Sequence, residues 1–287
     1  MNVLPYIFVL LAAMLWGTVG TTQTFLQEGV SPFAVAGVRS GIGGGLLLLT
    51  VIFMRKINLR DWSWKWTILA ALAIALFQCL FFTSVRFTGV AVGTVVTIGS
   101  SPVFAGVIEW LIWKVRPTRV WGIATLLAIV GCVLLFVNRG GAVVDPVGVL
   151  LALCAGIMFA LYTNVSKQLM AKEETLPAVA MTFSLCALFL LPLAARGGFG
   201  WVAEPQNLWP MLFMGVVATS VAYLLFLASL KKISSSAAVT LSLAEPLTAA
   251  LLGVFLIGEY LSATSWVGVA LLLGGIIVLT FGSRRAT

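Results

Sequence analysis

Glu245 is the side chain in this sequence best placed for chemistry, because it lies near the middle of a long apolar stretch. An ionisable group within a membrane-length apolar segment is costly and by default indicates a functional site. Pro246 follows directly and predicts a helix kink that exposes the carbonyl of Ser242 beside the carboxylate. Glu245 is therefore a candidate for proton coupling or for binding an ammonium group. The alternative is a neutral, hydrogen-bonded acid that only holds helices together.

Polar and aromatic side chains at helical spacing extend this candidate site. Gln78 shares a helix face with Phe82 at i+4, and Thr97 shares one with Ser101. Such faces would form a cavity wall with polar anchors and aromatic surfaces, suited to small amphiphilic solutes. The alternative is that these polar groups only join helices, at about 0.6 kcal/mol per hydrogen bond on average. The predicted substrate cavity is lined by Trp16, Gln78, Phe82, Thr97, Ser101, Phe159, Tyr223, Ser242 and Glu245.

Other kinds of chemistry find little support in the residue types. The chain has no His, the commonest acid/base group and metal ligand. Its four Cys all fall inside apolar runs, far from any C-x-x-C spacing, so neither a zinc site nor a disulfide framework is expected. The sequence therefore predicts no metal, no cofactor and no enzymatic activity.

The composition predicts an all-α integral membrane protein. Of 287 residues, 61% are hydrophobic and only 9% charged, with a mean hydropathy of +1.12, whereas soluble domains carry about 25% charged residues. At about 20 residues per span, the length allows ten helices and almost no soluble domain. The phosphate-binding loop of an ATP-driven pump is also missing from the sequence. Any transport would therefore be secondary or passive.

Ten apolar stretches have spanning length and are bounded by charge, Gly or Pro. They cover residues 4–26, 32–54, 66–86, 90–113, 119–137, 146–166, 176–195, 207–230, 235–258 and 263–282. The first has no Lys or Arg before it, so it is interpreted as a span and not as a signal peptide.

The distribution of Lys and Arg between alternate loops predicts the orientation. One side holds thirteen, including Arg284 and Arg285, and the other holds Arg86, Arg139 and Arg196. Because cytoplasmic loops retain Lys and Arg, both termini should be cytoplasmic. The same loops account for the net charge of +8, so nucleic-acid binding is not expected.

The two halves of the chain resemble each other weakly but in order. At an offset of 144, Ser101-Pro102 aligns with Glu245-Pro246 and Thr118 aligns with Ser262. The sequence therefore predicts repeats over residues 1–140 and 141–287, with paired helix kinks at Pro102 and Pro246. Five helices per repeat is an odd number, which gives inverted topology and a substrate site near the midplane. The alternative is that apolar helices resemble each other by composition.

Particular motifs resemble those of a known family. The runs 242–247 (SLAEPL), 256–261 (LIGEYL) and 266–275 (WVGVALLLGG) resemble the ninth and tenth helices of the drug/metabolite transporter (DMT) superfamily, EamA type. The first half resembles the companion repeat through Leu15-Trp16-Gly17, Arg39 and Pro102. It lacks the acidic residue before Pro102, so the two halves are not functionally equivalent.

This resemblance covers essentially the whole chain and implies ten helices, two inverted repeats and export of small metabolites. Within the family the chain is most similar to YddG-type bacterial amino-acid exporters, including those for aromatic amino acids. The expected partners are a small-molecule substrate and the lipid bilayer of the bacterial cytoplasmic (inner) membrane, with the protein as a monomer. Two alternatives stay open: a facilitated-diffusion carrier for other metabolites or drugs, and a non-transport membrane scaffold.

Three further features have mainly structural interpretations. Arg39 is expected to anchor its helix near the headgroups, although it could also attract anionic groups. Glu109 is expected to form an interfacial pair near Lys114. Glycines at 37, 41 and 45 put a small face on one helix, where another backbone can approach.

Overall fold

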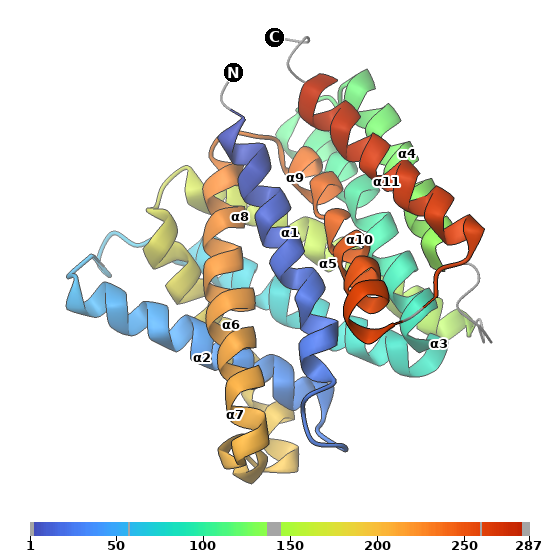
Figure 1. Ribbon diagram of the computed structural model, residues 1–287. Helices are drawn as coiled ribbons and strands as arrows, with labels where there is room; N and C mark the ends of the chain where they lie inside the picture. The colour runs from blue at the N-terminus through green and yellow to red at the C-terminus, as the bar shows by residue number, and fades with distance from the viewer. Residues whose placement is uncertain (1–2, 57, 137–144, 259, 283–287) are drawn as a thin grey trace.

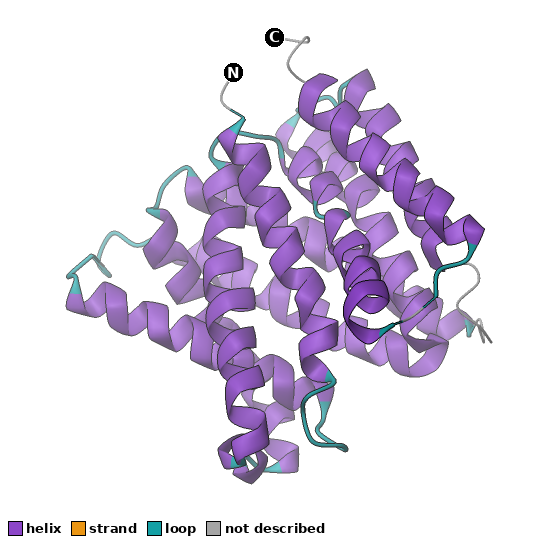
Figure 2. Cartoon of the chain, viewed as in Figure 1, coloured by secondary structure: helices purple, strands orange, loops and turns teal. Residues whose placement is uncertain are grey.

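The computed structural model describes residues 3–56, 58–136, 145–258 and 260–282, and these residues form helices and loops without any strand (Figures 1 and 2). The first half contains α1 (Leu4–Gln23), α2 (Pro32–Phe53), α3 (Trp64–Trp113) and α4 (Arg119–Phe136). The second half contains α5 (Pro146–Met170), α6 (Thr175–Ala194), η1 (Ala195–Gly197), η2 (Gly200–Ala203), α7 (Pro205–Leu212), η3 (Phe213–Val221), α8 (Ala222–Leu230), α9 (Ser235–Leu241), α10 (Ala244–Leu252), η4 (Gly253–Ile257) and α11 (Ala263–Gly282). Arg139, Arg284, Arg285 and the expected repeat boundary at 140 lie outside the described residues.

Most helices are long and apolar enough to cross a bilayer. Within the described chain, eight segments meet this condition, and a shorter apolar helix covers Arg119–Leu135. One of the eight is α3, with 50 residues, which is divided at Gly89 (φ 78°, ψ 165°). That backbone conformation favours glycine, which has no Cβ to clash. The division falls between the predicted spans 66–86 and 90–113.

The predicted spans 207–230 and 235–258 are composite helices. The first is built from α7, the π-helical segment η3 and α8, and the second from α9, α10 and the π-helical segment η4. π-Helical turns are rare in proteins overall, but those that occur are often found at functional sites. Between α9 and α10, Ser242 and Leu243 form a turn, so the helix is interrupted just before Glu245.

Helix starts repeat between the halves at the offset of 144. At the start of α4, the Thr118 hydroxyl accepts a hydrogen bond from the Trp121 N–H (3.1 Å). At the start of α11, the Ser262 hydroxyl accepts one from the Ser265 N–H (3.1 Å). Both are N-cap bonds, which satisfy an otherwise unpaired backbone donor.

The pair formed by α4 and α11 has a reciprocal contact that fits the same offset (Figure 1). A Cβ atom added to Gly131 would lie 2.7 Å from the Gly268 carbonyl oxygen, and one added to Gly275 would lie 2.7 Å from the Ala124 oxygen. Exchanging the halves turns the first contact into the second. Such reciprocity is expected of two units related by a two-fold axis.

Candidate functional site

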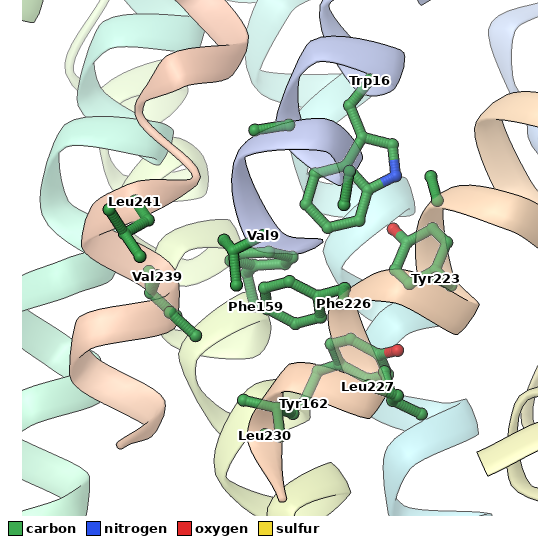
Figure 3. Close-up of a cluster of buried hydrophobic side chains, with 14 of the residues drawn as sticks. Val9, Trp16, Phe159, Tyr162, Tyr223, Phe226, Leu227, Leu230, Val239 and Leu241 are labelled. Atoms are coloured by element: carbon green, nitrogen blue, oxygen red, sulfur yellow. The ribbon is translucent and has the colours of Figure 1, made fainter. Parts of the chain in front are cut away.

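The centre of the bundle holds a cluster of aromatic rings from both halves of the chain (Figure 3). Trp16 of α1 lies with its ring centroid 4.8 Å from that of Tyr223 and 5.2 Å from that of Phe226, both on α8. Phe159 of α5 lies 6.2 Å from Trp16. Such tilted and edge-on pairs suit the electrostatics of aromatic rings. Three predicted site residues, Trp16, Phe159 and Tyr223, therefore meet in space.

The residue after Trp16 explains why α1 comes so close to this centre. A Cβ on Gly17 would lie 2.7 Å from the Glu245 carbonyl oxygen and 2.7 Å from the Thr248 Cβ. Only glycine allows this approach of two helix backbones. The Leu15-Trp16-Gly17 motif thus packs α1 against α10 and brings the Trp16 ring into the same region as Glu245.

Glu245 lies in the first turn of α10, directly after the break between α9 and α10. Its side chain is half-buried, and among the described residues no hydrogen bond or ion pair holds the carboxylate. The Ser242 hydroxyl donates to the Ala238 carbonyl (3.0 Å) and so is bonded within its own helix. The Ser242 carbonyl, predicted to be exposed by Pro246, instead accepts the Glu245 N–H (2.9 Å), because the tight turn brings that donor onto it.

Arg39 of α2 turns inward, which differs from its interpretation as a headgroup anchor. Its Nη2 donates to Oε1 of Gln78 (3.0 Å) on α3. Gln78 is 2% exposed and its Nε2 lies 3.4 Å from the Cys186 sulfur, so both ends of the amide are fixed. A buried acceptor on the neighbouring helix draws the guanidinium inward.

Four other predicted residues lie on α3. The Thr97 hydroxyl donates to the Ala152 carbonyl of α5 (3.1 Å), and the Ser101 hydroxyl donates to the Thr97 carbonyl (2.7 Å). Phe82 contacts Phe81 (5.4 Å between ring centroids), and Phe81 is linked to Phe159 of the aromatic cluster through Phe77. Pro102 lies within α3, where the helix continues on both sides.

The aromatic cluster also contains residues that the sequence analysis did not single out. Tyr162 lies 5.9 Å from Tyr223, and Phe183 lies 4.3 Å from it. Tyr162 follows Phe159 at i+3 and Phe226 follows Tyr223 at i+3, a spacing that places each pair on one helix face. That spacing was a usable signal for both pairs. For Phe183 on α6 no such signal is present.

A groove on the outside of the bundle is separate from this centre. It has a volume of about 430 Å³, lies between α2 and α6, and is lined by Gly37, Val38, Gly41, Ile42, Ser184, Ala187, Leu188, Leu191, Ala194 and Phe199. Its lining carries no charged side chain and does not include Glu245 or the central rings. Among the described residues, no group of three or more His, Cys, Asp or Glu side chains could hold a metal ion.

A bundle of apolar, membrane-length helices with charged and aromatic side chains at its centre is characteristic of multi-pass membrane transporters. The chain matches the model of the EamA-like transporter family over residues 3–137 and again over residues 146–281, and it belongs to that family. The EamA resemblance in the sequence is thereby confirmed, and the chain is a multi-pass membrane transporter.

Similar proteins cover nearly the whole chain. The uncharacterized transporter YwfM of Bacillus subtilis (strain 168) is 46% identical over 279 residues, which cover 97% of this chain and 94% of that protein. The uncharacterized inner membrane transporter YicL of Salmonella typhimurium (strain LT2) is 28% identical over 290 residues, 96% of this chain and 95% of that protein. A solved structure at 18% identity shares the fold, with a TM-score of 0.85 and 98% of each chain covered.

Proposed function

We propose that this protein is a secondary transporter that exports small metabolites, specifically amino acids including aromatic ones, by alternating access. The observation that carries the proposal is the central cluster, where Trp16 of the first repeat meets Tyr223 of the second beside Glu245. Substrate sites of inverted-repeat transporters lie between the repeats near the midplane. The YddG-type resemblance of the sequence supports amino acids as the substrate class.

The proposed architecture has ten spans in two inverted five-helix repeats. Dividing α3 at Gly89 and including α4 brings the eight long segments to ten spans. In Figure 1, α1 begins and α11 ends at the same end of the bundle, which fits an even number of spans. The Lys and Arg distribution supports a cytoplasmic position for that end. We propose a monomer in the bacterial cytoplasmic (inner) membrane.

Flux into liposomes tests the transport proposal directly. The purified protein would be reconstituted, and the movement of labelled amino acids and related metabolites compared with that in protein-free vesicles. We expect aromatic and large apolar amino acids to move fastest, because the rings of Trp16, Phe159 and Tyr223 offer apolar surface. If no amino acid moves faster than through protein-free vesicles, the substrate class is wrong.

A second experiment separates proton-coupled transport from facilitated diffusion, which the single carboxylate of the site leaves as the alternative. In the variant Glu245→Gln, accumulation driven by a pH gradient would be compared with downhill exchange at equal pH. Loss of accumulation with exchange retained assigns the coupling proton to Glu245. Unchanged accumulation removes Glu245 as the coupling site, and no accumulation in the wild type favours facilitated diffusion.

A further inference from the structure

The centre of the protein holds two opposite charges that come from different repeats. Arg39 belongs to α2 in the first repeat and Glu245 to α10 in the second. The Gln78 amide that holds Arg39 lies against Cys186 of α6, and Phe183, one turn away on that helix, lies 4.3 Å from Tyr223 between ring centroids. On the other side, Gly17, next to Trp16, packs on the Glu245 backbone. Tyr223 packs against Trp16 with 4.8 Å between ring centroids. A cation, an anion and an aromatic wall therefore share one region.

The two charges do not neutralise each other by direct contact. Among the described residues, the only ion pair within 4.0 Å joins Lys56 and Glu174 at the surface. Arg39 is held by the neutral acceptor Gln78 (3.0 Å), and no described group donates to the Glu245 carboxylate. Unpaired charges in a low-dielectric centre are costly. A ligand that pairs with both would remove that cost.

A second group in the same region, besides Glu245, has no hydrogen-bond partner among the described residues. The Trp16 side chain is 6% exposed, and its Nε1 has no hydrogen-bond partner in the described part of the chain. In Figure 3 this nitrogen lies on the side of the indole ring that faces Tyr223. Buried polar groups are normally hydrogen-bonded, so an orphan donor here indicates a ligand or a water molecule.

We propose that Arg39 and Glu245 together select a zwitterion: the carboxylate of an α-amino acid binds Arg39 and its ammonium binds Glu245. The Trp16 N–H supplies an additional donor to the carboxylate, and the apolar side chain of the substrate packs against the central rings. This inference rests on the proposed function and names the groups that give it specificity. It gives Arg39 the anion-binding role that the sequence left as the alternative to a headgroup anchor.

The arrangement discriminates against ligands that carry one charge. A carboxylate without an ammonium would pair with Arg39 but be repelled by Glu245, and an amine without a carboxylate would be repelled by Arg39. A neutral ligand would leave both charges unpaired. Specificity of this kind depends on the repulsive contact as much as on the attractive one. Because the two charges belong to different repeats, a bound zwitterion also links the repeats to each other.

Equilibrium binding to the purified, detergent-solubilised protein tests this selection separately from transport. Isothermal titration would use L-phenylalanine and L-leucine as zwitterions, phenethylamine as the cation, and 3-phenylpropionate as the anion. We expect the wild type to bind the two zwitterions at least about 10-fold more tightly than either single-charge analogue, given the cost of leaving a buried charge unpaired. Equal affinity for L-phenylalanine and one analogue would overturn the proposal.

Charge-removing variants make the test specific to the two residues. Arg39→Gln should lose the preference for the zwitterions over phenethylamine. Glu245→Gln should lose the preference for the zwitterions over 3-phenylpropionate. Each variant thus loses a different one of the two preferences. Arg39→Lys keeps the charge and should keep the preference for the zwitterion. Arg196→Gln, which removes an exposed Arg outside the site, is the matched control and should change nothing.

The outcomes separate this proposal from the transport proposal. Each variant is judged by the ratio of its affinities, so a general loss of folded protein does not imitate the expected result. An equal loss of affinity for every compound in Arg39→Gln would contradict a selective role. If the wild type binds none of the four compounds, the zwitterion site is wrong, while flux of other metabolites into liposomes would still uphold transport.

Discussion

The segments around Ser101-Pro102 and Glu245-Pro246 occupy equivalent positions in the two halves, but they differ in backbone and in polar pairing. In the first half, α3 continues through Ser101, whose hydroxyl is bonded to the Thr97 carbonyl. In the second half, a turn at Ser242 and Leu243 interrupts the helix, and the Glu245 carboxylate has no bond among the described residues. In the first half, the Ser101 hydroxyl is therefore hydrogen-bonded within its own helix. In the second half, the equivalent residue carries a carboxylate without such a bond.

In both halves, a glycine of another helix packs closely on this segment. Gly17 packs on the Glu245 carbonyl, and Gly156 of α5 packs on the Thr97 carbonyl, where an added Cβ would lie 3.0 Å from the oxygen. The close helix approach is thus shared by both halves. The halves therefore share this close packing but differ in the helix break and in the side chains, so a similar scaffold carries an asymmetric site.

The largest expected effect concerns the symmetric frame at the crossing of α4 and α11. Gly131→Ala and Gly275→Ala should each lower the free energy of unfolding by about 1–3 kcal/mol, because each new Cβ meets a backbone oxygen 2.7 Å away. The measurement is thermal unfolding in detergent. The two variants should be similarly damaging, since the contacts are equivalent.

The matched control is Gly274→Ala on α11, the helix of Gly275, where an added Cβ meets nothing within 4 Å. It should be neutral or slightly stabilising, because alanine favours the helix. If Gly131→Ala were harmless and Gly275→Ala damaging, the reciprocal relation between the halves would be lost.

A second prediction concerns Glu109, whose structural role belongs to one half alone. Its carboxylate is 3% exposed and accepts the N–H groups of Ser235 (3.0 Å) and Ser236 (3.1 Å) at the start of α9. The expected interfacial pair with Lys114 is not found among the described residues, because these two donors hold the carboxylate inside. Its equivalent at the offset of 144 is Gly253, which has no side chain to make such bonds.

Glu109→Ala should therefore lower the free energy of unfolding by about 2 kcal/mol, the scale of hydrogen bonds to a charged group. Glu109→Gln should lower it less, since one acceptor oxygen remains. Glu174→Ala is the control, because it breaks an exposed ion pair with Lys56 that contributes little. Equal effects of Glu109→Ala and Glu174→Ala in thermal unfolding would contradict a stabilising role of Glu109 as the cap of α9.

A third prediction returns to a shared feature, the N-caps of α4 and α11. Thr118→Ala and Ser262→Ala should each lower the free energy of unfolding by about 1 kcal/mol, because each removes the acceptor for a backbone N–H. Thr118→Ser and Ser262→Thr keep that acceptor and should stay close to the wild type. Thermal unfolding that showed a large effect in one half and none in the other would indicate that the caps are not equivalent.

Much of the frame could be predicted from the sequence because apolar length and glycine have direct physical meaning. The division of α3 fell where two predicted spans met, since Gly89 tolerates a positive φ. The composite nature of the span that contains Tyr223 could not be predicted, because nothing in the largely apolar run 205–230 distinguishes π-helical from α-helical pairing.

The position of only some candidate site residues could be predicted. Trp16, Phe159 and Tyr223, which the sequence analysis named as cavity residues, pack together. The inward turn of Arg39, in contrast, depends on the acceptor Gln78 of another helix. A sequence shows the depth of a residue along its own helix but not which neighbour faces it. The same reason hid the cap that Glu109 makes, since its donors lie 126 and 127 residues away in the chain.

The smallest expected effect decides whether Thr97 lines the substrate cavity or only joins two helices. Its hydroxyl donates to the Ala152 carbonyl (3.1 Å), and its equivalent in the second half is the apolar Leu241. Thr97→Val keeps the shape and removes the bond, so it should lower the free energy of unfolding by about 0.6 kcal/mol, the average for such bonds in membranes. Liposome flux of the best substrate should be unchanged. A clear loss of flux with normal unfolding would instead place Thr97 in the substrate path, and the first half would then contribute a polar group to the site that the second half lacks.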